Sequence, residues 1–166
     1  MKALFILLLT FSAAVAKADL NDEFTNFIVT YSEQSHLYGE REVKLEKFSP
    51  AQQAQLLKLA TAEADIWVDT ILEGDYALTN DPLTIDMVTA LYQGQKLVAY
   101  QIVYSQRAFD TSNCEYDFEA LDDKSSNVDE VFAQCTQGRI YGTSFVSPNL
   151  QVVERDINNI EYFEEQ

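Results

Sequence analysis

The sequence predicts an α+β protein in which one or two N-terminal helices pack on a curved antiparallel β-sheet. Apolar residues in the first part of the chain recur at helical spacing, whereas those after Gly74 alternate with a period of two. The connections between the alternating segments are short. Short connections require antiparallel neighbours, because a parallel neighbour needs a crossover of about a dozen residues. Helices followed by a meander of strands define the α+β class.

The N-terminus has the pattern of an export signal. A positively charged start is followed by an apolar run from Ala3 to Phe11, and Ala16-Lys17-Ala18 has the small-x-small pattern that signal peptidase cleaves. A membrane anchor is the competing interpretation. A bilayer-spanning helix needs about 20 apolar residues, and the apolar stretch here, from Ala3 to Ala16, is shorter. We therefore expect residues 1–18 to be a cleaved signal peptide and residues 19–166 to form a single α+β domain that is periplasmic or secreted.

The chain is strongly acidic, with 27 Asp and Glu against 11 Lys and Arg, which gives a formal net charge of −16. Such an excess repels nucleic acid and anionic membrane surfaces. We expect no nucleic-acid partner, and no membrane association after signal cleavage. A basic protein, a cation or a small ligand is compatible with this charge. The alternative is that the acidic surface only keeps an exported protein soluble. Nothing in the sequence indicates the oligomeric state.

The chain has two cysteines, Cys114 and Cys135, without metal-binding spacing. In an oxidising compartment such a pair predicts one structural disulfide. Closing a loop of this length stabilises the fold by about 3 kcal/mol. A redox role would need a Cys-x-x-Cys pair, which the sequence lacks.

Two helices are predicted before Gly74. Over Asp19–Tyr31, apolar residues lie at i, i+3, i+4 and i+7, and the charge-rich segment His36–Phe48 is either an edge strand or a linker. Ser49-Pro50-Ala51-Gln52 has an N-cap serine, a proline at the first helical position and a glutamine that completes a capping box. We expect this second helix to end at Gly74. The alternative is that the helix ends near Asp65 and that Ile66–Leu72 forms a strand. Its predicted apolar face is Leu56, Leu57, Ala60, Ala64, Trp67, Val68 and Ile71.

Seven strands are predicted after Gly74: Tyr76–Leu78, Ile85–Tyr92, Leu97–Phe109, Tyr116–Leu121, Val131–Cys135, Ile140–Phe145 and Val152–Tyr162. The longest, Leu97–Phe109, is partly apolar on both sides, which indicates a sheet covered on both faces. This element order resembles that of cystatin-like and NTF2-like domains, in which a curved sheet wraps a long helix. The cystatin inhibitor pattern Gln-x-Val-x-Gly is missing from the sequence. A fold-level resemblance implies no activity.

Aromatic residues provide the candidate ligand site. Trp67, Tyr100 and Tyr104, with Tyr92 and Phe109 beside them, can line a pocket between helix and sheet. The alternative is that these rings fill the core. A cavity among these rings would support the ligand pocket, whereas close packing without a void larger than a water molecule would support the core.

Two further groups of residues have the elements of a site. His36, the sole histidine, lies between Glu33 and Glu40, which on one helix face would assemble an acid–base group; the alternative is an exposed bystander. Asp123, Ser125, Asn127 and Asp129 alternate like the first ligands of a calcium loop. The glycine and the closing glutamate of that loop are replaced by Val128 and Gln134, which favours a solvated acidic loop.

No nucleophile elbow, phosphate loop, dinucleotide fingerprint or zinc-protease motif occurs, so we expect no catalytic residues, no metal and no cofactor. The expected function is an exported acidic binding or interaction protein without enzymatic activity. The alternatives are a small periplasmic enzyme that uses a cystatin-like or NTF2-like cavity, and an extracellular inhibitor that acts through exposed turns. An enzyme needs a concave pocket with a strongly perturbed titratable group.

Overall fold

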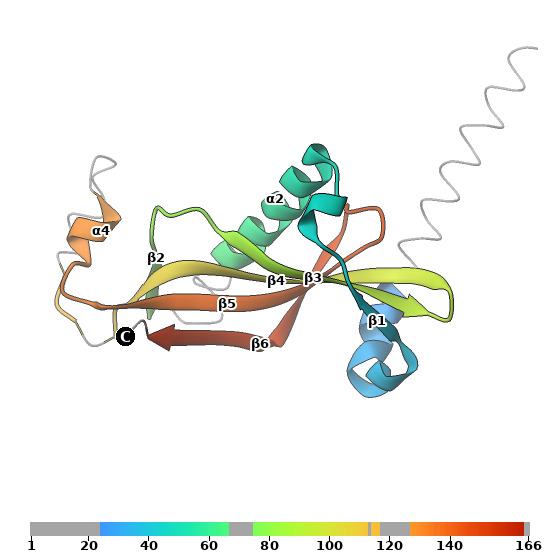
Figure 1. The fold of residues 1–166 in the computed structure, drawn as a ribbon. Coiled ribbons are helices and arrows are strands. Elements are labelled where there is room, and N and C mark those ends of the chain that lie inside the picture. Colours follow the sequence, from blue (N-terminus) through green and yellow to red (C-terminus); the bar gives the residue numbers. More distant parts are fainter. Residues whose placement is uncertain (1–23, 67–74, 113, 117–126, 165–166) are drawn as a thin grey trace, which may run out of the picture.

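A computed structural model describes residues 24–66, 75–112, 114–116 and 127–164. It contains a curved, six-stranded antiparallel sheet with helices packed on its two faces (Figure 1). The predicted α+β class is therefore confirmed. The similarity to cystatin-like or NTF2-like domains rests on element order alone.

The helical elements are a helix over residues 24–34, the 3₁₀ turns η1 (Ser35–Leu37) and η2 (Leu45–Lys47), α2 (Pro50–Ile66) and α4 (Val128–Val131). The strands are β1 (Gly39–Glu42), β2 (Tyr76–Leu78), β3 (Thr84–Gln93), β4 (Lys96–Asp110), β5 (Thr136–Val146) and β6 (Val153–Glu164). The charge-rich segment before α2 therefore contains an edge strand, one of the two alternatives that its sequence left open.

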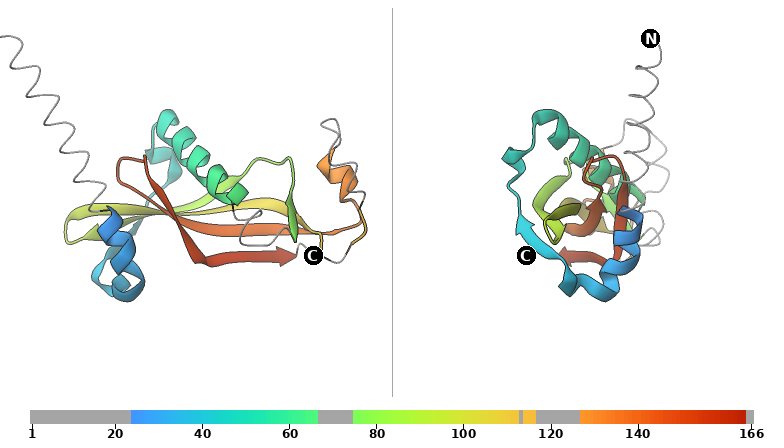
Figure 2. Two further views of the ribbon diagram at one scale, coloured as in Figure 1. Left: turned by 180° about the vertical axis from the view of Figure 1, so that it is seen from behind. Right: turned by 90° about the vertical axis from the view of Figure 1, so that its right-hand side faces the viewer.

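The sheet is built around β4, the longest strand. The strand order is β1-β3-β4-β5-β6, and β2 pairs with the far end of β4, so β2 and β3 lie along the same side of it. The tight turn between β3 and β4 begins at Gly94, whose φ of +64° is a left-handed conformation that favours glycine. Seen along the sheet, the strands twist and curl below α2 (Figure 2).

Helix α2 begins as its sequence predicts. The Ser49 backbone N–H donates to the Gln52 side chain at 2.9 Å, and the Gln52 N–H donates to Ser49 Oγ at 3.4 Å, which is the reciprocal pattern of a capping box. Leu56 and Ala60 are fully buried in the core cluster on this face of the sheet.

The predicted apolar face of α2 is wrong at Leu57, which is 40% exposed. Each helical residue turns the side chain by about 100°, so Leu57 lies at the edge of the stripe centred on Leu56 and Ala60. Trp67, Val68, Ile71 and the predicted end of the helix at Gly74 lie outside the described residues.

The opposite face of the sheet is covered by the helix at residues 24–34, at the end near the β3–β4 turn (Figure 1). Phe24 and Phe27 are buried there with Leu91 and Phe145. Both faces of β4 are therefore covered, as its two partly apolar sides indicated.

The far end of the sheet carries α4 and the disulfide. Cys114 and Cys135 are bonded, with a Cα–Cα distance of 5.0 Å, which confirms the predicted bridge. The strand predicted at Val131–Cys135 is wrong: this segment is the end of α4 followed by turns. Its apolar residues are buried by a local cluster around Phe109 and the disulfide, not by a sheet face. The predicted strand from Tyr116 is not seen at Tyr116 itself, and the remainder lies outside the described residues.

Candidate functional site

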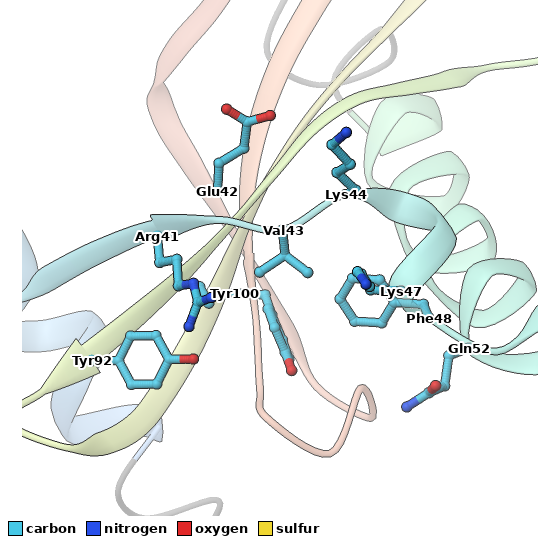
Figure 3. A pocket seen from close by; sticks show the side chains of 10 residues that line it. Arg41, Glu42, Val43, Lys44, Lys47, Phe48, Gln52, Tyr92 and Tyr100 are labelled. Atoms are coloured by element: carbon cyan, nitrogen blue, oxygen red, sulfur yellow. The ribbon is translucent and has the colours of Figure 1, made fainter.

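A pocket of about 520 Å³ opens between β1, η2, the first turn of α2 and one face of the sheet (Figure 3). This volume lies within the range of about 300–1,000 Å³ that is typical of small-molecule sites. The residues that line it are Arg41, Glu42, Val43, Lys44, Lys47, Phe48, Gln52, Ala90, Tyr92 and Tyr100.

The floor of the pocket is aromatic. Tyr100 on β4 lies directly across from Ala90 on β3, and the small alanine side chain leaves space beside the tyrosine ring. Phe48, only 7% exposed, contacts Tyr100 edge-to-face with ring centroids 5.3 Å apart. Edge-to-face contact is one of the two arrangements that aromatic pairs prefer, so this contact helps to orient the Tyr100 ring.

Tyr100 is a hydrogen-bond donor in this site. Burial raises the pKa of its hydroxyl above the ordinary value, and the neighbouring Tyr92 adds to the rise. An ordinary phenol, with a pKa of about 10, is already protonated at neutral pH, and the raised pKa extends this state to more alkaline pH, so the hydroxyl can donate a hydrogen bond to a ligand.

Three cationic side chains line the pocket: Arg41, Lys44 and Lys47. Within the part of the chain that the structure describes, none of them forms an ion pair. Side chains alternate across a strand, so Arg41 and Glu42 point to opposite sides of β1. Figure 3 shows Arg41 on the side of Tyr92 and Tyr100, with Glu42 directed away from those rings.

Gln52 serves both the helix and the pocket. Its side-chain oxygen accepts the hydrogen bond from Ser49 N–H that completes the capping box. The same bond directs the amide nitrogen away from the helix start, and Figure 3 shows this nitrogen on the side that faces Tyr100. The cap therefore positions an additional donor at the pocket.

Comparison with known proteins returns no match. This holds for family models, for curated proteins and for solved structures. Among the helices of the described residues, none combines the length and the apolar character needed to cross a membrane.

The structure separates the aromatic residues that the sequence grouped. Tyr100 lines the pocket with Tyr92. Tyr104 is 1% exposed in the core, where its hydroxyl lies 3.0 Å from Ser144 Oγ. Phe109 belongs to the cluster around the disulfide, and Trp67 lies outside the described residues.

The other candidate groups do not assemble. His36 is exposed in η1, after the helix that contains Glu33 has ended, and Glu40 is in β1. Asn127 caps α4 by accepting from the Asp129 N–H at 3.2 Å, while Asp123 and Ser125 lie outside the described residues. In the described part of the chain, no group of three or more His, Cys, Asp or Glu side chains is placed to hold a metal ion.

Sequence reasoning missed Arg41, Lys47 and Gln52 as functional candidates. A signal was present: Arg41, Lys44 and Lys47 are three basic residues within seven positions of a chain with 11 in total. Gln52 was identified from its cap alone. Its second role depends on the position of the sheet below it, which the sequence pattern does not reveal.

Proposed function

We propose that this chain is an exported, non-enzymatic binding protein, and that the pocket between β1 and α2 holds a small ligand. One observation carries the proposal: three of the 11 lysines and arginines line one cavity in a chain with 27 acidic residues. Surface cations in so acidic a protein have many possible carboxylate partners. Among the described residues these three cations have no ion pair, and they line a void with an aromatic floor; apolar cavities with a few placed polar groups are typical of small-molecule sites.

Export is supported by two independent features. The N-terminal pattern at residues 1–18 is that of a secretory signal, and the Cys114–Cys135 disulfide is of the kind that persists in oxidising compartments. In this proposal the mature protein is residues 19–166, a single domain in the periplasm or the medium.

The alternative is a small enzyme that uses the same cavity. The Tyr100 hydroxyl is protonated at neutral pH, where it can orient a bound ligand or act as an acid, so turnover of the ligand is what separates the two functions. The cystatin-like or NTF2-like element order is an analogy that supplies no activity.

The proposal is tested by native mass spectrometry of the secreted protein, mixed with the small-molecule filtrate of the source organism's medium. We expect one bound equivalent of a small molecule. Ala90→Met fills the floor between Ala90 and Tyr100, and should abolish this adduct. The control is Thr61→Met on the exposed side of α2, which should retain it.

Two outcomes would contradict the proposal. An adduct equally abundant in Ala90→Met and in the wild type would place the ligand elsewhere, provided that both fold by circular dichroism. A filtrate component that disappears with time, while a product of different mass accumulates in proportion to wild-type protein, would favour the enzyme.

A further inference from the structure

We propose that the ligand of this pocket is a small organic anion with a flat ring, of the aromatic carboxylate class. This inference rests on the proposed function and names the chemistry of its ligand. The features that carry it are the sign of the charge on the pocket's inner side, the rings that form the floor, and the neutral hydrogen-bond donors between them.

The inner side of the pocket is positively charged. Of the lining residues on the side of the aromatic floor, Arg41 and Lys47 are cationic, while the one carboxylate, Glu42, points to the other side of β1 (Figure 3). Glu42 and Lys44 also line a neighbouring pocket of about 380 Å³. A carboxylate is the natural partner of Arg41, because the guanidinium fork binds carboxylate oxygens in a bidentate manner.

The floor of the pocket favours a planar, apolar body. Phe48, Tyr92 and Tyr100 present ring surface to the cavity, and Ala90 leaves the space next to it. Aromatic rings prefer offset or edge-to-face contact with another ring, and add about 0.5–1.5 kcal/mol beyond area burial when they find it. A ligand with a flat ring can make these ring contacts with the floor, whereas a compact inorganic anion cannot.

Two neutral side chains of the pocket, Gln52 and Tyr100, can donate hydrogen bonds to a ligand. The Gln52 oxygen is occupied by the Ser49 N–H, so its amide nitrogen is the end available to a ligand. The Tyr100 hydroxyl is protonated at neutral pH, as an ordinary phenol is, and has no hydrogen-bond partner among the described residues. Such donors pair with the lone pairs of a carboxylate ligand. A cationic ligand would place its own donors and its charge against Arg41 and Lys47, which disfavours it.

The test uses three probes of nearly the same shape and different charge: 2-naphthoate, 2-naphthamide and 2-naphthamidine, each titrated into the secreted protein by isothermal calorimetry. We expect 2-naphthoate to bind at least about tenfold more tightly than the amide, and the amidine to bind more weakly still. Acetate, which has the carboxylate without the ring, should bind too weakly to measure.

Charge-removing variants locate the effect. The double variant Arg41→Gln with Lys47→Gln should weaken 2-naphthoate binding by roughly tenfold and leave the amide unchanged, because two charge-assisted contacts are lost. Lys58→Gln is the matched control: it removes one positive charge from the exposed side of α2, away from the pocket, and should change affinity less than about twofold.

The outcomes separate this inference from the proposed function. Equal binding of all three naphthalene probes that is lost in Ala90→Met keeps the pocket as the ligand site and refutes the anionic class. Tighter binding of the amidine also refutes that class. If no probe binds and the native filtrate gives no adduct, the proposed function fails as well. Selective binding of 2-naphthoate that depends on Arg41 and Lys47 supports both.

Discussion

The two ends of the sheet use their charged and aromatic residues differently. At the disulfide end, Arg107 on β4 is paired with Asp81, and the Gln106 side chain donates to the backbone oxygens of Thr79 and Asp81 at 3.1 and 3.2 Å. Phe109 and Phe132 pack against the disulfide. At the pocket end, Arg41 and the two lysines surround a void and have no ion pair within the described residues.

This difference shows where the fold retains binding capacity. At the disulfide end, Arg107 and Gln106 have their partners within the fold, and their side chains hold the segment between β2 and β3 against β4. The pocket end leaves donors and ring surface exposed to a cavity. We therefore expect substitutions at the disulfide end to alter stability without affecting binding, and substitutions of the pocket cations Arg41 and Lys47 to do the reverse.

The largest effect on stability is expected from the double variant Cys114→Ser with Cys135→Ser. Removing a bridge that closes 21 residues of sequence should lower the free energy of unfolding by about 3 kcal/mol. Urea unfolding measures this loss, and calorimetry should show unchanged affinity for 2-naphthoate. A weakened affinity in the folded double variant would mean that the two ends are coupled.

A smaller loss of stability is expected at the helix cap, where two variants distinguish the role of Gln52 in the helix from its role in the pocket. Ser49→Ala and Gln52→Ala each remove half of the capping box, and each should cost about 1 kcal/mol of stability. Only Gln52→Ala also removes the amide donor at the pocket, so only this variant should weaken 2-naphthoate binding. Equal affinities in the two variants would show that Gln52 serves the helix alone.

The arginines give the most direct contrast between the ends. Arg107→Gln removes the partner of Asp81 and should cost up to about 1 kcal/mol, the usual limit for a partly exposed ion pair. Arg41→Gln should cost nothing measurable in thermal unfolding, since Arg41 has no ion pair among the described residues. If Arg41→Gln proves the more destabilising, the pocket arginine has a structural role that this account does not include.

The smallest expected effect is on the pH dependence of stability. The raised pKa of Tyr100 means that the folded state holds this proton more tightly than the unfolded state. Its contribution to stability is therefore complete below about pH 10 and is lost as the pH rises through the raised pKa. Tyr100→Phe should lose less of its melting temperature between about pH 9 and about pH 11 than the wild type. Parallel curves for the two proteins would contradict the buried position of the hydroxyl.

Much of the fold followed from local patterns. The capping box at Ser49 located the start of α2, and the change to a period of two located the sheet, because these signals depend on neighbouring residues. The segment Val131–Cys135 was mistaken for a strand, because its apolar residues are buried by a long-range disulfide cluster and not by alternation. Periodicity alone does not distinguish these two causes of burial.

The candidate site was less predictable. Tyr100 was identified as an aromatic candidate, but the same reasoning chose Tyr104, whose hydroxyl is instead paired with Ser144 in the core. The net charge of −16 was compatible with a basic protein, a cation or a small ligand, and it gave no indication that the local lining of the pocket is cationic. A sum over the chain does not show where the few basic residues converge, because that depends on β1 pairing with β3 beside the start of α2.

The most direct test of the account is the position of 2-naphthoate on the protein, measured by intermolecular nuclear Overhauser effects. We expect contacts from the naphthalene protons to the rings of Phe48 and Tyr100, which form the floor of the pocket. Contacts instead to Phe27 and Tyr38, which line a separate pocket of about 280 Å³ beside the helix at residues 24–34, would contradict it.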